Sequence, residues 1–492
     1  MGVEMKERLQ IIAWKVCIVV LGVMLLSKFG LLLAGTKVPE EEDVLHFQAL
    51  DIIQQGKEVI TENDTENVEK LVPTPVPTPF VLTNFDKIRV VITNKATGSV
   101  YHENANSIDA ADYRGEMEVV ETKEGFVFIN ELPLEEYLYS VVPSEMPASY
   151  PMEALKAQAI CARTYAYLHI LSPGYPAWNA HVDDTTTYQV YHNVEEQEST
   201  TQAVQETQGI VLLSPDKAGL AQTYYYSTSC GFGSDAHVWR TKYADEYPYL
   251  QAKAMNAQAV MMDFAEGEKE FVETMTTGAT GYQTLLYTAE TLRGEEVFAN
   301  YIKTVNEADW EAEENWYRWE YEVEKADTDR MLKTLQKRYA ANEDLVLTLE
   351  GSKYVSKPIK ELDTLVDIQV VQRGAGGVAD ELLIITEKNV YKVITELNIR
   401  YVLNDGETKV KRHDGTSVSM NSLLPSGFFV IENQYKNGEV KGYKIIGGGF
   451  GHGAGMSQNA AKAMALEGMS AEEILTFFFE DCTLEKAVQK GI

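Results

Sequence analysis

The fold is decided by the stretch Leu134-Glu-Glu-Tyr-Leu-Tyr-Ser-Val-Val-Pro-Ser-Glu145-Met-Pro and by the alanine-rich segment after it, Pro151-Met-Glu-Ala-Leu-Lys-Ala-Gln158-Ala-Ile-Cys-Ala-Arg163-Thr-Tyr165. Glu145 is a carboxylate that stands between apolar residues and two prolines. Burial there would disfavour its ionised form and raise its pKa, as a general acid working near neutral pH requires. A second interpretation stays open, in which Glu145 caps the next helix or is exposed in a turn.

The alanine-rich segment predicts a helix with a closely packed face. Pro151 suits the first turn of a helix, and the alanines leave so little bulk that neighbouring backbone can approach. Gln158 and Tyr165 share one face, as do Lys156 and Arg163, and we expect one of these pairs to point toward a substrate. The other interpretation makes Lys156 a solvated charge and Arg163 part of a structural ion pair.

A second informative segment is the glycine-rich run Gly447-Gly-Gly-Phe-Gly-His452-Gly-Ala-Gly-Met-Ser457-Gln458. Its glycines let the backbone approach a ligand closely, so His452 could contact a substrate or orient an acid. A tight turn with a satisfied histidine is the alternative. No Gly-Lys-Ser/Thr follows, which argues against nucleotide binding. A helix is predicted from 459 to 467, and Ser470 with Glu473 predicts a capping box for the next one.

Other segments predict a mixture of strands and helices. Tyr224-Tyr-Tyr-Ser227-Thr-Ser229-Cys-Gly predicts a strand running into a glycine turn, with hydroxyls and aromatic faces that suit a sugar. Later segments predict strands at 316–323, 365–372, 381–386 and 390–394, and a helix at 328–339. The mixture predicts an α+β architecture.

Taken in order, these motifs resemble the stage II sporulation protein D and amidase-enhancer (SpoIID/LytB) family of bacterial cell-wall proteins. The resemblance covers the chain from about residue 82 to the C-terminus. It rests on Leu-Glu-Glu-Tyr-Leu with Val-Pro-Ser-Glu145-Met-Pro, on Ala154-Leu-Lys-Ala-Gln-Ala with Ala162-Arg-Thr-Tyr, on Asp184-Thr-Thr-Thr-Tyr-Gln189-Val-Tyr, on Tyr226-Ser-Thr-Ser and on Gly449-Phe-Gly-His-Gly-Ala-Gly-Met-Ser-Gln.

The resemblance implies a two-lobed catalytic region with a groove between the lobes. It also implies a lytic transglycosylase, which cuts peptidoglycan between N-acetylmuramic acid and N-acetylglucosamine and leaves a 1,6-anhydro end. Glu145 matches the family's catalytic acid, and no cofactor is expected. The residues expected to bind substrate around it are Gln158, Arg163, Gln189, Tyr226, Ser227, His452, Ser457 and Gln458.

Two alternatives to this activity stay open. Hydrolysing glycosidases usually need a second carboxylate, for which Asp183 and Asp184 are the candidates, although we expect them to be turn or capping residues beside a strand at 188–191. The protein could instead bind the wall without cleaving it and stimulate a cell-wall amidase. Its partners would be glycan strands and an amidase, sporulation or division complex, and a vegetative role stays open beside sporulation.

Composition is consistent with an exported protein that recognises a polymer through specific contacts. The chain has 492 residues, 45% of them hydrophobic, enough for more than one lobe. Its formal net charge of −31 argues against nucleic-acid binding, which needs clustered Lys and Arg. We therefore expect recognition by hydrogen-bonding groups and aromatic faces.

The N-terminal region predicts the location. Residues 11–33 are almost wholly apolar and long enough to span a bilayer, with basic residues before them and acidic residues after them. We expect a single-pass anchor in the cell membrane, with the N-terminus cytoplasmic and the rest exported; a cleaved signal peptide is the alternative. The predicted divisions are an anchor at 1–35, an acidic and Pro-rich linker at 36–81, a first catalytic part at 82–255, a second lobe at 256–440, and a C-terminal part at 441–492 that completes the first.

The four cysteines are Cys17, Cys161, Cys230 and Cys482, and free buried thiols are expected. A disulfide between Cys161 and Cys230, or between Cys230 and Cys482, stays open. Some sporulation members of the family carry zinc ligands just before the Gln-x-Tyr motif. At those positions this chain has Val182, Thr187 and Tyr188, so we expect no metal, although His181, Cys230, His237 and His452 remain scattered candidate ligands.

Overall fold

The computed structural model describes residues 87–192, 194–216, 219–240, 244–257, 287–420 and 422–487. The chain divides into two compact units, Met1–Thr74 and Pro75–Ile492, and every described residue belongs to the second. The predicted anchor, the predicted linker and Cys17 lie outside the described residues. None of the helices that are described is both long enough and apolar enough to cross a membrane.

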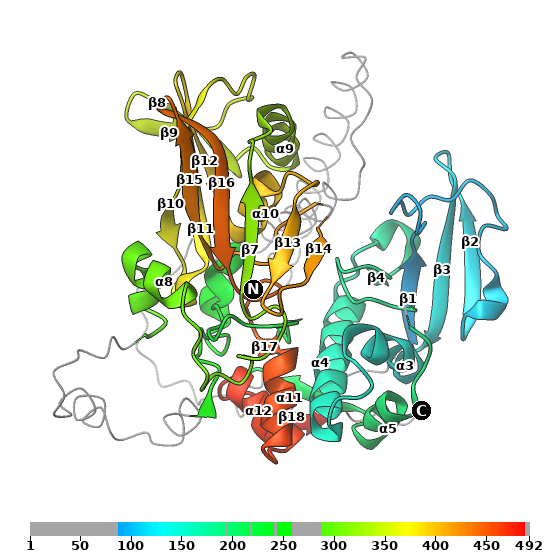
Figure 1. The fold of residues 1–492 in the computed structure, drawn as a ribbon. Helices are drawn as coiled ribbons and strands as arrows, with labels where there is room; N and C mark the ends of the chain where they lie inside the picture. Colours follow the sequence, from blue (N-terminus) through cyan, green and yellow to red (C-terminus); the bar gives the residue numbers. More distant parts are fainter. Residues whose placement is uncertain are drawn as a thin grey trace, which may run out of the picture. The chain divides into compact units, whose positions relative to one another are not determined.

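The described residues form a mixed α+β structure, as the sequence predicts. Its first part is a four-stranded sheet of order β2-β3-β1-β4 with three helices (Figure 1). Strand β1 pairs antiparallel with β3 and parallel with β4. The bounds are β1 Lys87–Ile92, β2 Glu116–Glu121, β3 Phe126–Pro133, α3 Leu134–Glu145, α4 Met152–Leu171, β4 Val182–Asp183 and α5 Glu198–Glu206.

Helix α3 carries Glu145 as its last residue, and local sequence sets this position. Pro147 disfavours a helical conformation at the residue before it, and Met146 is extended, with φ of −133°. On the inner face of α3, Tyr137, Leu138, Val141 and Val142 are buried in one cluster with alanines of α4. Helix α4 begins directly after Pro151, and its small side chains allow this close packing.

The second part contains two five-stranded sheets, of order β10-β11-β12-β8-β9 and β14-β13-β7-β16-β15. Their inner faces share a large apolar core with α9 and α10. The predicted strands and helix in this part are confirmed. The bounds are α8 Glu295–Ile302, β7 Trp319–Val323, α9 Thr328–Ala341, β8 Val346–Glu350, β9 Lys353–Val355, β10 Leu365–Arg373, β11 Ala379–Thr386, β12 Val390–Ile394, α10 Glu396–Leu403, β13 Lys409–Arg412, β14 Ser417–Ser419, β15 Phe429–Lys436 and β16 Glu439–Gly447.

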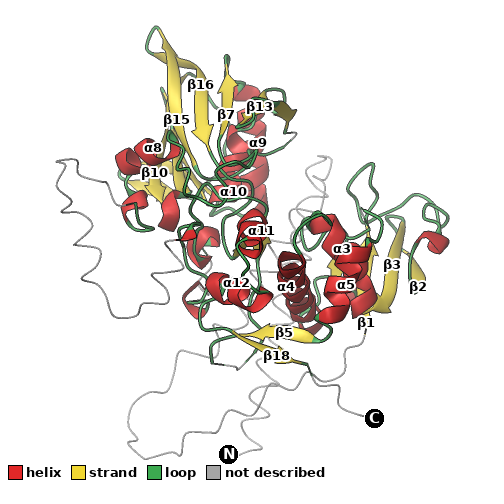
Figure 2. Cartoon of the chain, turned by 60° about the horizontal axis from the view of Figure 1, so that its bottom comes forward, coloured by secondary structure: helices red, strands yellow, loops and turns green. Residues whose placement is uncertain are grey.

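The C-terminal segment returns to the first part, as expected. After β16 the glycine-rich loop leads into β17, which pairs parallel with β6, and then α11 and α12 pack on α4 (Figures 1 and 2). The last strand, β18, pairs antiparallel with β5. The bounds are β5 Ile210–Leu213, β6 Tyr225–Tyr226, β17 Met456–Ser457, α11 Gln458–Leu466, α12 Ala471–Phe478 and β18 Thr483–Lys486.

Local predictions for this region have mixed outcomes. The capping box of Ser470 and Glu473 at the start of α12 is confirmed, and Cys161, Cys230 and Cys482 are free and buried. The predicted strand at 188–191 is wrong, because these residues form an irregular loop. The parallel partner of β1 is instead Val182–Asp183, and the Thr185–Tyr188 turn follows it.

Candidate active site

Glu145 lies where three segments meet. Its carboxylate Oε1 accepts a hydrogen bond of 2.7 Å from the backbone N–H of Val190. The Gln458 amide donates to the backbone carbonyl of Glu145 at 3.0 Å, although Gln458 lies more than 300 positions away in sequence. The side chain is partly buried, so it keeps some contact with solvent. The fold therefore holds the Glu145 carboxylate through Val190 and the Glu145 backbone through Gln458, while the side chain stays partly exposed.

The environment of Glu145 changes its acidity. Burial disfavours the charged carboxylate and raises its pKa to about 7, while hydrogen bonds from Val190 and the Tyr225 hydroxyl offset part of that effect. A carboxyl group with this pKa is present in both protonation states near neutral pH. It can therefore donate a proton and later accept one, as the sequence prediction requires.

Three glutamines hydrogen-bond to the segments and side chains around Glu145. Gln458 donates to Gln158 Oε1 at 3.3 Å as well as to Glu145. Gln189 donates to the carbonyl of Ala162 at 3.2 Å and to the Tyr225 hydroxyl at 3.1 Å. Gln158 and Gln189 are fully buried, so in this structure they position the site and have no surface for a substrate. Gln458 is 8% exposed and has the same supporting role.

The glycine-rich loop holds His452 as a neutral imidazole. Burial lowers the pKa of His452 to about 4. Its Nδ1 accepts the N–H of Ala454 at 3.1 Å, which places the ring proton on Nε2. The ring lies 5.7 Å from that of Tyr226 and 5.2 Å from that of Trp239. Gly455 is essential to this arrangement, because at φ of 77° an added Cβ would lie 2.1 Å from the Tyr224 carbonyl oxygen.

The hydroxyl groups predicted to bind sugar occupy two places. Ser227 is partly buried, and its Oγ lies 3.0 Å from Thr228 Oγ1. Ser457 is fully buried and donates to Glu311 Oε1 at 2.6 Å. Glu311 also accepts from Ser229, through its N–H at 2.9 Å and through its hydroxyl. Burial raises the pKa of Glu311 to about 7.

Arg163 lies among buried groups and away from solvent. Its side chain is 0% exposed and forms a two-pronged ion pair with Glu135, with N···O distances of 2.8 Å. It also donates to the carbonyls of Val204 and Ile210, both at 3.1 Å. This corrects the predicted substrate contact: Arg163 has the structural ion pair that the sequence left open, and its other hydrogen bonds go to buried groups of the protein.

The two candidates for a second carboxylate stabilise turns. Asp183 accepts from the Tyr175 hydroxyl at 2.6 Å and from Thr185 N–H at 2.8 Å. Asp184 accepts from both the N–H and the hydroxyl of Thr93, at 3.0 and 2.7 Å. These contacts are the turn and capping roles expected for them.

Among the described residues no group of three or more His, Cys, Asp or Glu side chains could hold a metal ion.

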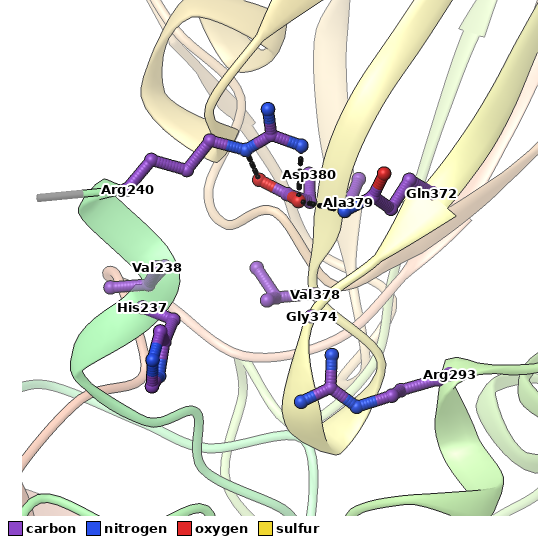
Figure 3. A pocket seen from close by; sticks show the side chains of 9 residues that line it. All are labelled: His237, Val238, Arg240, Arg293, Gln372, Gly374, Val378, Ala379 and Asp380. Carbon is purple, nitrogen blue, oxygen red and sulfur yellow. Dashed lines mark hydrogen bonds and ion pairs between the residues drawn. The ribbon is translucent and has the colours of Figure 1, made fainter. Parts of the chain in front are cut away.

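A cavity of about 340 Å³ is lined by His237, Val238 and Arg240 on one side, and by Arg293 and the ends of β10 and β11 on the other (Figure 3). Arg240 is already paired with Asp380 at 2.6 Å, and Arg293 with Glu290 at 2.8 Å. The lining of this cavity includes none of the groups that bind Glu145.

Several residues of the site were not predicted from the sequence. Tyr225 contacts Glu145 and Gln189, whereas the prediction favoured its neighbour Tyr226. The Val190 N–H is a backbone group, and no side-chain motif indicates it. Glu311 lies in a region without a family motif, and its only sequence signal is an acidic side chain between Trp310 and Ala312.

Comparison with known proteins shows which proteins this chain is similar to. Residues 122–213, which include Glu145, match the model of the stage II sporulation protein family, and residues 235–455 match a domain of unknown function, DUF8618. The Amidase enhancer of Bacillus subtilis (strain 168) is 26% identical over 351 residues, which are 70% of this chain and 40% of that protein.

Other relatives match a shorter region. Stage II sporulation protein D of Bacillus amyloliquefaciens is 34% identical over 138 residues, which are 25% of this chain and 39% of that protein. An uncharacterized protein of Brachyspira hyodysenteriae is 37% identical over 136 residues, 26% of this chain and 34% of that protein. The matches thus cover between 34% and 40% of the relatives' lengths. The chain therefore contains a domain of the stage II sporulation protein family, residues 122–213, which includes Glu145.

Proposed function

We propose that this protein is a lytic transglycosylase that cleaves peptidoglycan between N-acetylmuramic acid and N-acetylglucosamine. Protonated Glu145 donates its hydrogen to the bridging oxygen while the bond from that oxygen to the anomeric carbon breaks. The 6-hydroxyl oxygen of the same muramic acid then bonds to the anomeric carbon, and its proton returns to Glu145. The products carry a 1,6-anhydro end, and no water is consumed.

One observation carries this proposal: Glu145 is a partly exposed carboxyl group with a pKa raised to about 7. The mechanism needs one group that acts first as an acid and then as a base, and a pKa near the working pH makes both steps accessible. The neighbouring Asp183 and Asp184 are engaged by Thr185, Tyr175 and Thr93. Their engagement favours transglycosylation over hydrolysis, which needs a free second carboxylate to act on water.

The remaining neighbours have supporting roles in this proposal. Gln158, Gln189 and Gln458 fix the segments around the carboxylate. Ser227 and His452 are partly exposed, so they are the predicted contacts for sugar hydroxyl and acetamido groups. The neutral imidazole of His452, with its proton on Nε2, does not compete with Glu145 as an acid at neutral pH.

The cellular setting is also a proposal. The matched domain and the similarity to Amidase enhancer and stage II sporulation protein D support a role in the bacterial cell wall or in sporulation, and we propose that residues 11–33 anchor the chain in the cell membrane. Fractionating cells that express the full chain, followed by protease treatment of intact protoplasts, tests the anchor. A protein found in the membrane fraction and digested from outside supports it, whereas a protein released into the medium indicates a cleaved segment.

The activity is tested by incubating purified full-length protein with glycan strands and identifying the new ends by mass spectrometry. We expect anhydro ends with the natural protein and a loss of at least about a hundredfold in rate with Glu145→Gln, the contribution typical of a general acid. Glu136→Gln is the matched control, since Glu136 lies on the same helix, is partly exposed and contacts Arg114 at 3.4 Å. Equal activity of Glu145→Gln and the natural protein would reject the assignment.

A second function has specific support, because the Amidase enhancer of Bacillus subtilis matches 70% of this chain. The protein would then bind the wall and stimulate an N-acetylmuramoyl-L-alanine amidase without cleaving glycan. Measuring amidase activity on purified walls with and without the full chain separates the two functions. Stimulation that persists in Glu145→Gln, with no new glycan ends from either protein, would support the non-catalytic function.

A further inference from the structure

A shallow cavity of about 520 Å³ lies at the four-stranded sheet of the first part. Its lining includes Arg89, Glu118, Val120 and the turn from Pro176 to Asn179. Trp178 ends the short helix of this turn and is partly exposed, and Asn179 beside it is exposed. An aromatic ring beside charged and amide groups is a composition that suits a carbohydrate, because the ring can stack on a pyranose while polar groups bind its hydroxyls.

The turn that presents Trp178 is held rigidly. Arg89 donates to the backbone carbonyl of Asn179 at 2.7 Å and lies 3.4 Å from that of Trp178. Its guanidinium is fixed in turn by Glu118 at 2.5 Å and Glu131 at 2.6 Å. Asn179 adopts a left-handed conformation, with φ of 51°. A ligand would therefore meet a preformed surface and would not have to order a loop.

Aromatic rings connect this cavity to the Glu145 site. The aromatic row consists of Trp178, Tyr175, Tyr188, His169, Tyr165 and Tyr224, all of them partly exposed. Successive ring centroids lie 5.8, 6.0, 4.9, 4.5 and 6.2 Å apart.

The aromatic row lies close to residues of the Glu145 site at two points, Tyr188 in its middle and Tyr224 at its end. Tyr188 lies two residues before Val190, whose N–H binds the Glu145 carboxylate. Tyr224 lies 6.3 Å from His452, measured between ring centroids. Chain and ring contacts are thus continuous from the Trp178 turn to Glu145.

We propose that the Trp178 turn is a second carbohydrate-binding subsite, which holds a sugar of the same glycan strand away from the bond that is cleaved. The proposal rests on the function proposed for Glu145, and it adds that the substrate is an extended strand. Trp178 stacks on the apolar face of a pyranose, and Asn179, Arg89 and Glu118 provide hydrogen-bonding groups at its edge. Long strands then bind more tightly than short fragments, because they engage both subsites.

The test measures binding without cleavage, using the full chain with Glu145→Gln in every variant. Isolated glycan strands, and separately a tetrasaccharide of two disaccharide repeats, are titrated into each protein by calorimetry. We expect Trp178→Ala to weaken binding of long strands about tenfold and to leave tetrasaccharide binding unchanged, and Trp178→Phe to restore most of the loss. Val119→Ala is the matched control, because Val119 is an exposed side chain on the same strand as Glu118 and Val120 but on its opposite face.

The outcomes separate this inference from the proposed function. Equal binding of long strands by Trp178→Ala and its parent would overturn the subsite. Equal loss for long strands and tetrasaccharide would also overturn it, since a general structural defect would then be the cause. If Trp178 governs strand binding while the protein with Glu145 intact forms no anhydro ends, the subsite stands and the proposed function fails.

Discussion

At the scale of single residues, the site depends on how one carboxyl group is surrounded. Glu145 ends a helix whose inner face is buried, and the chain beyond it is extended because Pro147 follows. The Val190 N–H and the Tyr225 hydroxyl favour its charged form, whereas burial favours its neutral form, and burial is the larger effect. The balance leaves the pKa close to neutrality, which neither influence alone would produce.

This balance predicts a pH dependence. Cleavage should need protonated Glu145, so its rate should fall as pH rises through about 7. Stability should change in the same range, because the folded protein retains a proton that the unfolded chain loses near pH 4.5. The stabilisation from this proton is complete below pH 4.5 and is lost as pH rises to about 7.

The measurement compares the natural protein with Glu145→Gln in urea unfolding at several pH values. The difference in unfolding free energy between them should change by at most about 3 kcal/mol across this range, the equivalent of the pKa shift. Because Glu311 is present in both proteins, its own titration cancels. A difference that does not vary with pH would contradict the raised pKa.

Sequence predicted the properties of a single residue where its neighbours showed that it would be buried. Apolar neighbours and prolines around Glu145 indicated burial, and burial is the largest cause of its pKa shift. The sequence named Tyr226 as a substrate contact but did not indicate that its neighbour Tyr225 binds Glu145, because adjacent residues of a strand face opposite sides. Three consecutive tyrosines show no alternation of polar and apolar residues, so the sequence does not indicate which of them faces Glu145.

At the scale of secondary-structure elements, α4 holds the site by fixing its neighbours. Arg163 joins α4 to Glu135 of α3, to the Val204 carbonyl of α5 and to the Ile210 carbonyl of β5. Sequence could place Arg163 on a helix but could not tell which elements would surround it, because they lie up to 47 residues away. The strand wrongly predicted at 188–191 has a similar cause, since Tyr-Gln-Val-Tyr has strand-forming residues but pairs with no strand in the described part of the chain.

We therefore expect Arg163→Ala to destabilise the protein by about 3 to 5 kcal/mol, since it leaves a carboxylate and two carbonyls without their buried partner. Lys156→Ala on the same helix is the control. Its ion pairs with Glu153 and Glu206 are partly exposed to solvent, so the expected loss is below about 1 kcal/mol. Urea unfolding of the full chain checks both values. Similar losses of unfolding free energy in the two variants would show that Arg163 does not hold α3, α4, α5 and β5 together.

At the scale of the whole described unit, Glu311 connects the region matched by DUF8618 to two segments near Glu145, the one after β6 and the one before α11. Its carboxylate binds Ser229, just after β6, and Ser457, just before Gln458 and α11. Sequence motifs identified the strand and the loop separately but gave no sign of this link. A contact between residues 146 positions apart depends on the path of the intervening chain, which local patterns do not specify.

Glu311→Ala should therefore lower stability by about 2 kcal/mol at neutral pH and speed amide hydrogen exchange at residues 447–458. The loss arises because three buried donors are left without their acceptor. The matched control is Glu313→Ala, two residues away, because Glu313 is exposed. Unchanged exchange in the glycine-rich loop of Glu311→Ala would mean that Glu311 does not support it.

The most direct test of the central claim is cleavage in water labelled with heavy oxygen. If Glu145 transfers its proton while the sugar's own 6-hydroxyl attacks, the new muramic acid ends contain no label and have the mass of the anhydro form. These ends should disappear in Glu145→Gln and persist in Glu136→Gln. Labelled reducing ends from the natural protein, or unlabelled anhydro ends from Glu145→Gln, would contradict the account.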